Sequence, residues 1–268
     1  PLLNCVQIDL TNQVQVNSMF EKFSPEWVVH CAAATDVDWC ENNPTLAQSI
    51  NSTSSKFVAM AARKFGSRLI YISTDSVFSG DDSNYTEFDQ PNPINIYSNT
   101  KLSGEKKVEE EIPDALIIRT NIYGWNPFPK LSLAEWILNR LKSSMQVHGF
   151  EDVIFNPILV NDLSDIILDC INYKLNGLYH IVGSESCSKY EFAKQVARLF
   201  GLNENKVVPV PIASKKLKAM RPINTSLDTR KIQSALGKNI PGVIQGLERM
   251  LYLRNSGFQA RLSAIRGG

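Results

Sequence analysis

The sequence predicts an α/β fold in which helices cover both faces of a doubly wound parallel sheet, with a smaller, mostly helical C-terminal lobe. Short β-branched or aromatic runs alternate with longer amphipathic stretches, which is typical of a parallel sheet covered by helices. Each short run is nearly continuous in apolar residues, as a strand buried on both faces should be. We therefore expect strands at residues 27–32, 68–74, 115–120 and 177–182.

The segments between these strands have helical patterns. Residues 12–23 place their apolar side chains roughly on one side, residues 44–65 are rich in Ala and Ser, and residues 97–111 carry a charged outer face. Further helices are expected at residues 131–141, 162–171, 188–200 and 229–236, before a frayed tail at 261–268. We divide the chain into a main domain, 1–124, and a lobe, 125–268, interleaved with the last sheet strands around 150–183.

The composition argues against several classes of function. The 28 Lys and Arg residues nearly balance the 27 Asp and Glu residues without a dense basic run, which disfavours nucleic acid and leaves small molecules or proteins as partners. The apolar runs are too short to span a membrane, and no signal peptide opens the chain. The five cysteines form no C-x-x-C pair, which fits a reduced, cytoplasmic setting. The three histidines lack the spacing of metal ligands, so we expect no metal.

Thr74 ends the strand predicted at residues 68–74, in the run Ile72-Ser73-Thr74-Asp75. In a doubly wound sheet the carboxyl ends of the strands face the ligand crevice, so a hydroxyl at this position can touch a substrate. Taken alone, the run is explained equally well as a turn-forming cluster that caps the next segment.

Tyr97 and Lys101 lie one helical turn apart on the same face of the next predicted helix. We expect the ammonium to favour the phenolate and to lower the pKa of Tyr97, which makes the phenol a usable general acid. Spacing alone is weak evidence, because Tyr190 and Lys194 repeat it within an ordinary helix. Only Tyr97 follows both a strand that ends in Ser-Thr and a proline-rich loop, so we choose the first pair.

In order along the chain, these segments resemble the dTDP-4-dehydrorhamnose reductases, an extended short-chain dehydrogenase family with a Rossmann sheet. The resemblance rests first on Ile72-Ser73-Thr74-Asp75, Val77-Phe78, the run from Pro91 to Tyr97, and Lys101-Leu102-Ser103-Gly104-Glu105. It extends to residues 30–38, 119–124, 177–180, 188–192 and 221–228, and therefore covers nearly the whole chain. As an ordered set, these motifs are highly specific.

The resemblance implies reduction of the 4-keto group of a nucleotide-linked deoxysugar by NADPH or NADH. Tyr97 would protonate the developing alkoxide, Lys101 would tune Tyr97 and hold the nicotinamide ribose, and Thr74 would hydrogen-bond the keto oxygen. A salt-bridged surface position explains Arg221 about as well as a substrate contact. The implied cofactor-binding residues are Asp9, Leu10, Ala32, Ala33, Ala34, Tyr97 and Lys101, and the implied substrate-binding residues are Thr74, Asp75, Asn121 and Arg221.

Three differences from the family pattern limit what the resemblance implies. Ser76 replaces a Tyr of the family, and Ile122 follows Asn121 where the family has Trp, so the exact sugar stays open. No G-x-x-G-x-x-G occurs, and the chain starts just before the segment equivalent to the second strand. We therefore expect an incomplete version of a longer protein, lacking the first strand, that binds NADPH far more weakly than the intact family. Micromolar NADPH binding in a titration would contradict this.

Other functions remain open. The regulatory beta subunit of methionine adenosyltransferase resembles the same family and serves a partner enzyme without acting as a reductase. Retention of Thr74, Tyr97 and Lys101 favours an enzyme, whereas the missing loop favours a binding module. A 4-epimerase or dehydratase of the superfamily fits less well, because a dehydratase would want an acidic residue after Asp75, where Ser76 stands. The sequence leaves the oligomeric state open, with a homodimer as one option.

Overall fold

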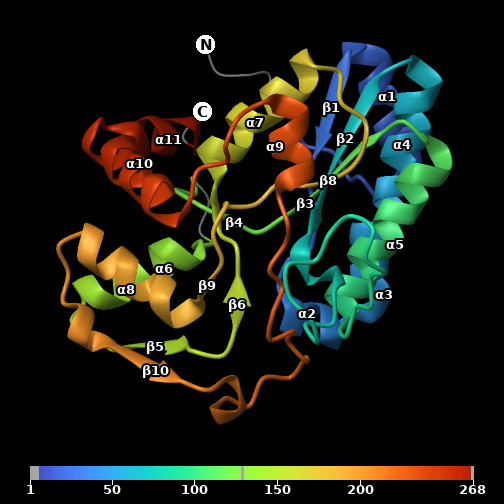
Figure 1. Ribbon diagram of the computed structural model, residues 1–268. Helices are drawn as coiled ribbons and strands as arrows, with labels where there is room; N and C mark the ends of the chain where they lie inside the picture. Colours follow the sequence, from blue (N-terminus) through green and yellow to red (C-terminus); the bar gives the residue numbers. More distant parts are fainter. Residues whose placement is uncertain (1–5, 128–129, 267–268) are drawn as a thin grey trace.

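Four parallel strands, in the order β1-β2-β3-β8, form the central sheet of the computed structural model, which describes residues 6–127 and 130–266 (Figure 1). Each lies within a predicted strand, so the predicted parallel α/β fold is confirmed. The sequence also predicted a segment near the start of the chain that is equivalent to the second strand of the family. This prediction is wrong for residues 6–26, which hold no strand, and residues 1–5 lie outside the described part. The strands are β1 (Trp27–His30), β2 (Arg68–Thr74), β3 (Leu116–Thr120) and β8 (Gly177–His180).

Helices cover both faces of this sheet, as expected when strands are apolar on both sides. One face is covered by α1 (Gln13–Phe23), α4 (Ser54–Phe65) and α5 (Ile96–Glu111) (Figure 1). The other is covered by α7 (Val160–Asn172) and α9 (Arg230–Leu236). α7 lies within the interleaving predicted around 150–183, whereas α9 lies outside it, so the C-terminal half contributes one more helix to the main layers than was predicted. The domain division at residue 124 stays a prediction.

Strand β2 shows how the two layers share one sheet. Leu69 and Tyr71 belong to the buried cluster beneath α1 and α4, whereas Ile70 and Ile72 belong to the cluster beneath α7 and α9. Burial of each such side chain contributes on the order of 1.5–3 kcal/mol. The strand ends at Thr74, whose side chain accepts a hydrogen bond from the Ser76 amide and begins a short 3-10 turn, η2 (Asp75–Val77). The sheet therefore carries Thr74 to its carboxyl edge.

The helix predicted at residues 44–65 is interrupted. It consists of α3 (Pro44–Gln48), one π-helical turn, η1 (Ser49–Thr53), and α4. A short helix that the sequence did not predict, α2 (Val37–Asn42), precedes it. Single π turns inside helices often occur at functional sites, and this one lies beside the site described below.

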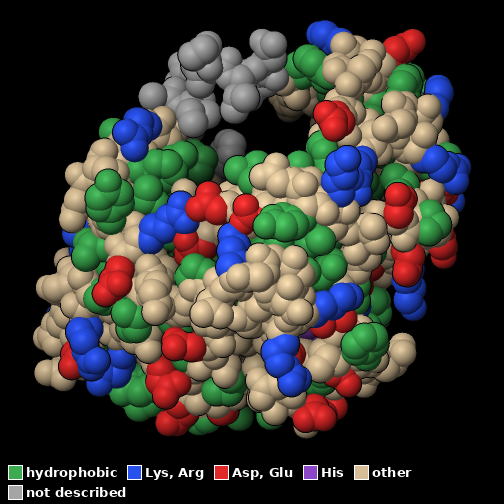
Figure 2. All heavy atoms as spheres, turned by 45° about the horizontal axis from the view of Figure 1, so that its top comes forward, with side chains coloured by type: hydrophobic (Ala, Val, Ile, Leu, Met, Phe, Trp, Pro, Cys, Tyr) green, Lys and Arg blue, Asp and Glu red, His purple; other side chains and the backbone are tan. Residues whose placement is uncertain are grey.

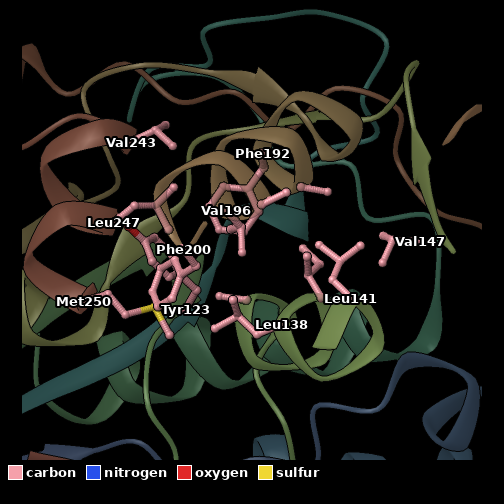
Figure 3. Close-up of a cluster of buried hydrophobic side chains, with 14 of the residues drawn as sticks. Tyr123, Leu138, Leu141, Val147, Phe192, Val196, Phe200, Val243, Leu247 and Met250 are labelled. Carbon is pink, nitrogen blue, oxygen red and sulfur yellow. The ribbon is translucent and has the colours of Figure 1, made fainter. Parts of the chain in front are cut away.

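The lobe has its own core between α6 (Leu133–Lys142), α8 (Lys189–Leu199) and α10 (Val243–Asn255). Its helices pack through apolar faces from segments far apart in the chain, as Figure 3 shows. The side chains that meet there include Leu138, Leu141, Phe192, Val196, Phe200, Leu247 and Met250. The parallel pair β5 (Val147–Phe150) and β10 (Val207–Val210) lies beside this core.

Short strands join the lobe to the main sheet. β4 (Ile122–Tyr123) pairs with β7 (Ile158–Leu159), and β6 (Ile154–Phe155) pairs with β9 (Cys187–Ser188). The remaining elements are η3 (Glu204–Lys206), η4 (Ile212–Ser214) and α11 (Phe258–Arg266). The prediction of a frayed tail at 261–268 is wrong as far as residue 266, because residues 261–266 belong to α11. Of the helices in the described ranges, none has both the length and the hydropathy needed to cross a bilayer.

A buried ion pair ties α5 to the sheet. Glu105 on α5 meets Arg119 on β3 through two hydrogen bonds, of 3.1 Å to Nε and 2.8 Å to Nη2, and both side chains are almost fully buried. The Ser73 hydroxyl also donates to the Glu105 carboxylate. Charges held in this way are costly to unpair, because neither partner can regain water.

We expect Glu105→Gln to lower the free energy of unfolding by about 3 kcal/mol, because it leaves the Arg119 cation buried without its counter-charge. Urea unfolding followed by circular dichroism measures this. Glu109→Gln, one turn further along α5 and exposed, is the matched control and should change the value by less than about 0.5 kcal/mol. Equal, small changes in the two variants would show that the buried pair does not fix α5.

Candidate active site

A cleft of about 690 Å³ opens at the carboxyl ends of β1, β2 and β3, against α7. This is where a doubly wound sheet binds its ligands. The side of the cleft formed by the sheet and α5 is mostly polar, and the α7 side is apolar. The predicted site residues in its wall are Ala33, Thr74, Asp75, Tyr97, Lys101 and Asn121. The apolar side is formed by Leu163, Ile167, Leu168 and Ile171.

Tyr97 lies in the first turn of α5, where the Asn95 side chain caps the helix by accepting a 2.9 Å hydrogen bond from the Ser98 amide. Burial raises the pKa of Tyr97 to about 12, and the charge of Asp75 adds to this increase. A side-chain hydrogen bond with Thr74 partly opposes it. The phenol therefore keeps its proton at neutral pH and lies beside the Thr74 hydroxyl.

The prediction that Lys101 lowers the pKa of Tyr97 is wrong for this structure. The Lys101 ammonium donates a 2.8 Å hydrogen bond to the Ile72 carbonyl and lies 4.2 Å from the centroid of the Tyr71 ring. Its charge is thus engaged by β2 instead of by Tyr97. Burial lowers the pKa of Lys101 to about 8, with the nearby Glu105 opposing this shift. Tyr97 remains a protonated phenol, which is the form that a proton donor needs.

The Asp75 carboxylate is buried but fully supplied with hydrogen bonds. Its Oδ1 atom accepts from Thr74 at 3.1 Å and from Ser76 at 3.2 Å. Its Oδ2 atom accepts from Asn121 at 2.7 Å and from Thr225 at 2.6 Å. Sequence reasoning missed Thr225, because it lies 150 positions from Asp75 and no local pattern marks it. Asp75 thus orients three hydroxyls and one amide at the border between the sheet and the lobe.

Asn51, in the π-helical turn, is a second residue that sequence reasoning missed. Its buried amide accepts a 2.7 Å hydrogen bond from the Ala34 N–H, and donates at 3.0 Å both to the Ala34 carbonyl and to the Thr100 hydroxyl. It therefore fixes the loop after β1 against α5, next to Lys101. The only sequence signal would have been an asparagine in the middle of an otherwise helical run, where it is a poor helix former.

The other predicted cofactor residues do not line the cleft. Asp9 is exposed and accepts hydrogen bonds from the side chain and the amide of Thr11, which lower the pKa of Asp9. Leu10 packs against the cluster beneath α1 and α4. Ala32 is exposed, and Ala34 is held by Asn51 just behind the cleft. Of the predicted cofactor residues that precede α2, the structure therefore brings only Ala33 to the cleft wall.

Arg221 lies in an ion pair with Asp38, with 3.0 Å between Nη2 and Oδ1, and outside the walls of the cleft. The Ala219 amide donates to the same carboxylate at 3.0 Å, and these contacts lower the pKa of Asp38. Arg221 thus anchors residues 218–221 of the lobe to α2.

A second cavity of about 650 Å³ lies in the lobe, between α6, β5, α8 and the segment at 215–217. Sequence reasoning missed it because its wall comes from four separate segments. Its aromatic side chains are Trp136 and Phe150, and its basic or imidazole side chains are Arg140, His148, Lys189, Lys215 and Lys216. No Asp or Glu belongs to this wall as far as the structure describes it.

Charge elsewhere is mixed. Figure 2 shows Lys and Arg side chains interspersed with Asp and Glu over the face that it presents. In the described ranges, no three His, Cys, Asp or Glu side chains are grouped so as to hold a metal ion. The cleft and the second cavity are therefore the candidate binding sites.

Residues 2–255 of the chain match the family described as RmlD substrate binding domain. The chain belongs to the RmlD family. The dTDP-4-dehydrorhamnose reductase of Escherichia coli strain K12 is 34% identical over 255 residues, covering 91% of this chain and 84% of the relative. The predicted resemblance is thereby confirmed.

Two further comparisons bear on the RmlD assignment. A crystal structure of dTDP-4-dehydrorhamnose reductase from Bacillus anthracis strain Ames, in complex with NADP, superposes with a TM-score of 0.86 at 34% identity. It covers 91% of this chain and 86% of that chain. Methionine adenosyltransferase 2 subunit beta of Bos taurus is 31% identical over 255 residues, 88% of this chain and 72% of the relative.

Proposed function

We propose that the protein reduces the 4-keto group of a nucleotide-linked deoxysugar with NADPH or NADH. The supporting observation is that Thr74, Tyr97 and Lys101 share one wall of a cleft in a member of the RmlD family. The Escherichia coli relative is named for dTDP-4-dehydrorhamnose, and the Bacillus anthracis relative binds NADP. A 4-keto sugar nucleotide is therefore the substrate class, and dTDP-4-dehydrorhamnose is the first compound to test.

The cleft offers groups that suit the nicotinamide half of such a cofactor. Lys101 supplies a buried cation that would hold the nicotinamide ribose, and the Tyr97 phenol lies in the same wall beside the cofactor's place. Thr120 also lines the cleft, and its Oγ1 atom is buried with no partner among the described residues. When bound, NADPH supplies a hydride. The residues proposed to contact the rest of the dinucleotide are Asp9, Leu10, Ala32, Ala33 and Ala34.

Tyr97 would donate its phenolic proton to the keto oxygen as that oxygen gains negative charge. The Thr74 hydroxyl, which donates to Asp75 in this structure, would turn its hydrogen to the same oxygen. Two donors whose oxygen atoms are already in place stabilise the developing alkoxide more than water would, because only a hydroxyl hydrogen has to turn. The apolar side chains of α7 border the same cleft and exclude water, which strengthens both hydrogen bonds.

The substrate would span both cavities. Asp75 and Asn121 lie in the cleft wall and are proposed to contact the sugar. The second cavity, with its aromatic and basic side chains, is proposed to hold the nucleotide. In this scheme residues 1–124 bind the dinucleotide, and residues 125–268 bind most of the sugar nucleotide.

A regulatory subunit is the alternative function, supported by the 31% identity to methionine adenosyltransferase 2 subunit beta. Co-purification distinguishes the two. A regulatory subunit would bring down a synthetase, whereas the enzyme would oxidise NADPH when a 4-keto sugar nucleotide is added. We further propose a cytoplasmic location, consistent with the free thiols of Cys31, Cys40, Cys170 and Cys187. A homodimer remains a proposal that analytical ultracentrifugation would test.

We expect Tyr97→Phe to lower kcat at least about a hundredfold, the usual effect of losing a general acid, with little change in NADPH affinity. NADPH oxidation and fluorescence titration measure the two quantities. Tyr190→Phe is the control, because Tyr190 lies on α8 in the lobe and Lys194 lies 5.9 Å from its ring centroid. Near-normal turnover in Tyr97→Phe, or an equal loss in Tyr190→Phe, would remove Tyr97 from the mechanism.

Arg221→Ala should raise KM for the sugar nucleotide more than it lowers kcat. The reason is that Arg221 anchors residues 218–221, which follow directly on the wall segment of the second cavity at 215–217. The control is Arg230→Ala, which removes a largely exposed side chain from its ion pair with Asp228 and should leave both constants unchanged. An unchanged KM in Arg221→Ala would mean that this anchor does not support substrate binding.

A further inference from the structure

Lys189, the first residue of α8, lies between the two cavities. Its side chain lines the second cavity. Burial lowers the pKa of Lys189 to about 8, and the charge of Asp75, in the wall of the catalytic cleft, partly opposes this shift. A short series of contacts connects the two groups. The Thr225 hydroxyl donates to Asp75, and the Thr225 amide donates to the Ile154 carbonyl at 3.0 Å. Ile154 pairs with Ser188, the residue before Lys189. A ligand that extends from one cavity to the other would therefore pass the Lys189 ammonium.

The ammonium of Lys189 has no carboxylate partner within ion-pair distance in the described part of the chain. It lies 3.3 Å from the centroid of the Phe155 ring, a contact that contributes on the order of 2 kcal/mol and supplies no negative charge. The Asp75 carboxylate is already occupied by donors other than Lys189, namely Thr74, Ser76, Asn121 and Thr225. A cation removed from water without a paired anion is costly, so this position favours an anion supplied by a ligand.

The local structure holds Lys189 at this position. β6 pairs with β9 so that Phe155 lies opposite Cys187, two residues before Lys189. The Lys189 amide donates to the Val153 carbonyl at 3.0 Å. The start of α8 is closed by a capping box, in which Glu191 accepts from the Ser188 amide at 2.8 Å. Glu191 is thus committed to the helix end, and the Lys189 side chain is left to meet a ligand.

The charge around Lys189 favours an anion. Arg140, Lys215 and Lys216 line the same cavity, and the Lys215 Nζ atom lies 3.1 Å from His148 Nδ1. No acidic side chain belongs to the described wall of this cavity. Trp136 and Phe150 add flat apolar faces of the kind on which a nucleobase stacks. An elongated ligand with an aromatic end and a negatively charged middle matches this arrangement.

We propose that Lys189 binds the diphosphate of the sugar nucleotide where the substrate passes from the second cavity into the catalytic cleft. Lys189 is then a specificity-determining residue, which makes the site prefer nucleoside diphosphate sugars to sugars or nucleosides without that group. The role rests on the proposed function, since a nucleotide-linked sugar carries its charge between the base and the sugar. A lysine bound to phosphate in this way acts as a point charge with three donors.

Isothermal titration of the full chain with two probes, dTDP and thymidine, tests this role without requiring turnover. Lys189→Met should weaken dTDP binding at least about tenfold, as expected for a lost hydrogen bond to a charged group, and leave thymidine binding unchanged. Lys189→Gln, which keeps a polar side chain, should lose dTDP affinity similarly, whereas Lys189→Arg should retain most of it. Lys194→Met, on the same helix beside Tyr190, is the matched control and should change neither affinity.

Three results would overturn the proposal. The first is unchanged dTDP affinity in Lys189→Gln, and the second is the absence of dTDP binding by the unsubstituted protein. The third is an equal loss of affinity for dTDP and thymidine, which would indicate that Lys189 only shapes the cavity. Failure of the proposed function looks different. In that case dTDP binds in a Lys189-dependent way, but no 4-keto sugar nucleotide is reduced. Conversely, the protein could reduce a 4-keto sugar nucleotide while its dTDP affinity does not depend on Lys189. That result would contradict only the role of Lys189 and would leave the proposed function intact.

Discussion

The close approach of α5 to β2 is the constraint on which the catalytic wall depends. Gly104 faces the strand at the point of contact, and a Cβ atom there would overlap the Tyr71 hydroxyl and lie 2.7 Å from the Asn51 carbonyl oxygen. Because nothing separates the two elements, Lys101 can reach the Ile72 carbonyl from α5. The buried ion pair between Glu105, the next residue, and β3 holds the helix at that distance. The position of Tyr97 beside Thr74 follows from these contacts.

The sheet and the helix spacing could be predicted from the sequence because both are local patterns. Strands buried on two faces are continuously apolar, and a tyrosine and a lysine one turn apart must share a helix face. The direction of the pKa shift at Tyr97 could not be predicted. The shift comes from burial of the phenol in the folded chain, and the Lys101 ammonium does not oppose it because its acceptor, the Ile72 carbonyl, lies on a different element.

Other parts of the site escaped sequence reasoning for the same physical reason. Thr225 meets Asp75 across 150 positions, and Asn51 acts through a π turn within a run that reads as one continuous helix. The second cavity is built from four segments, none of which carries a motif of its own. For Arg221, the sequence left a substrate contact and a salt bridge equally open, and the structure shows the salt bridge to Asp38. Residues that act by meeting a distant partner become visible only once the fold is known.

Transfer of hydride from the cofactor to the sugar is the central claim, and isotope transfer tests it most directly. The protein would be incubated with dTDP-4-dehydrorhamnose, or a panel of related 4-keto sugar nucleotides, and NADPH deuterated at C4 of the nicotinamide. Both C4 epimers would be used in turn. We expect one epimer to give a reduced sugar nucleotide that carries a single deuterium at C4 of the sugar, as located by mass spectrometry and NMR. Folded protein that yields no deuterated product with either epimer, across the whole panel, would contradict the assignment as a reductase.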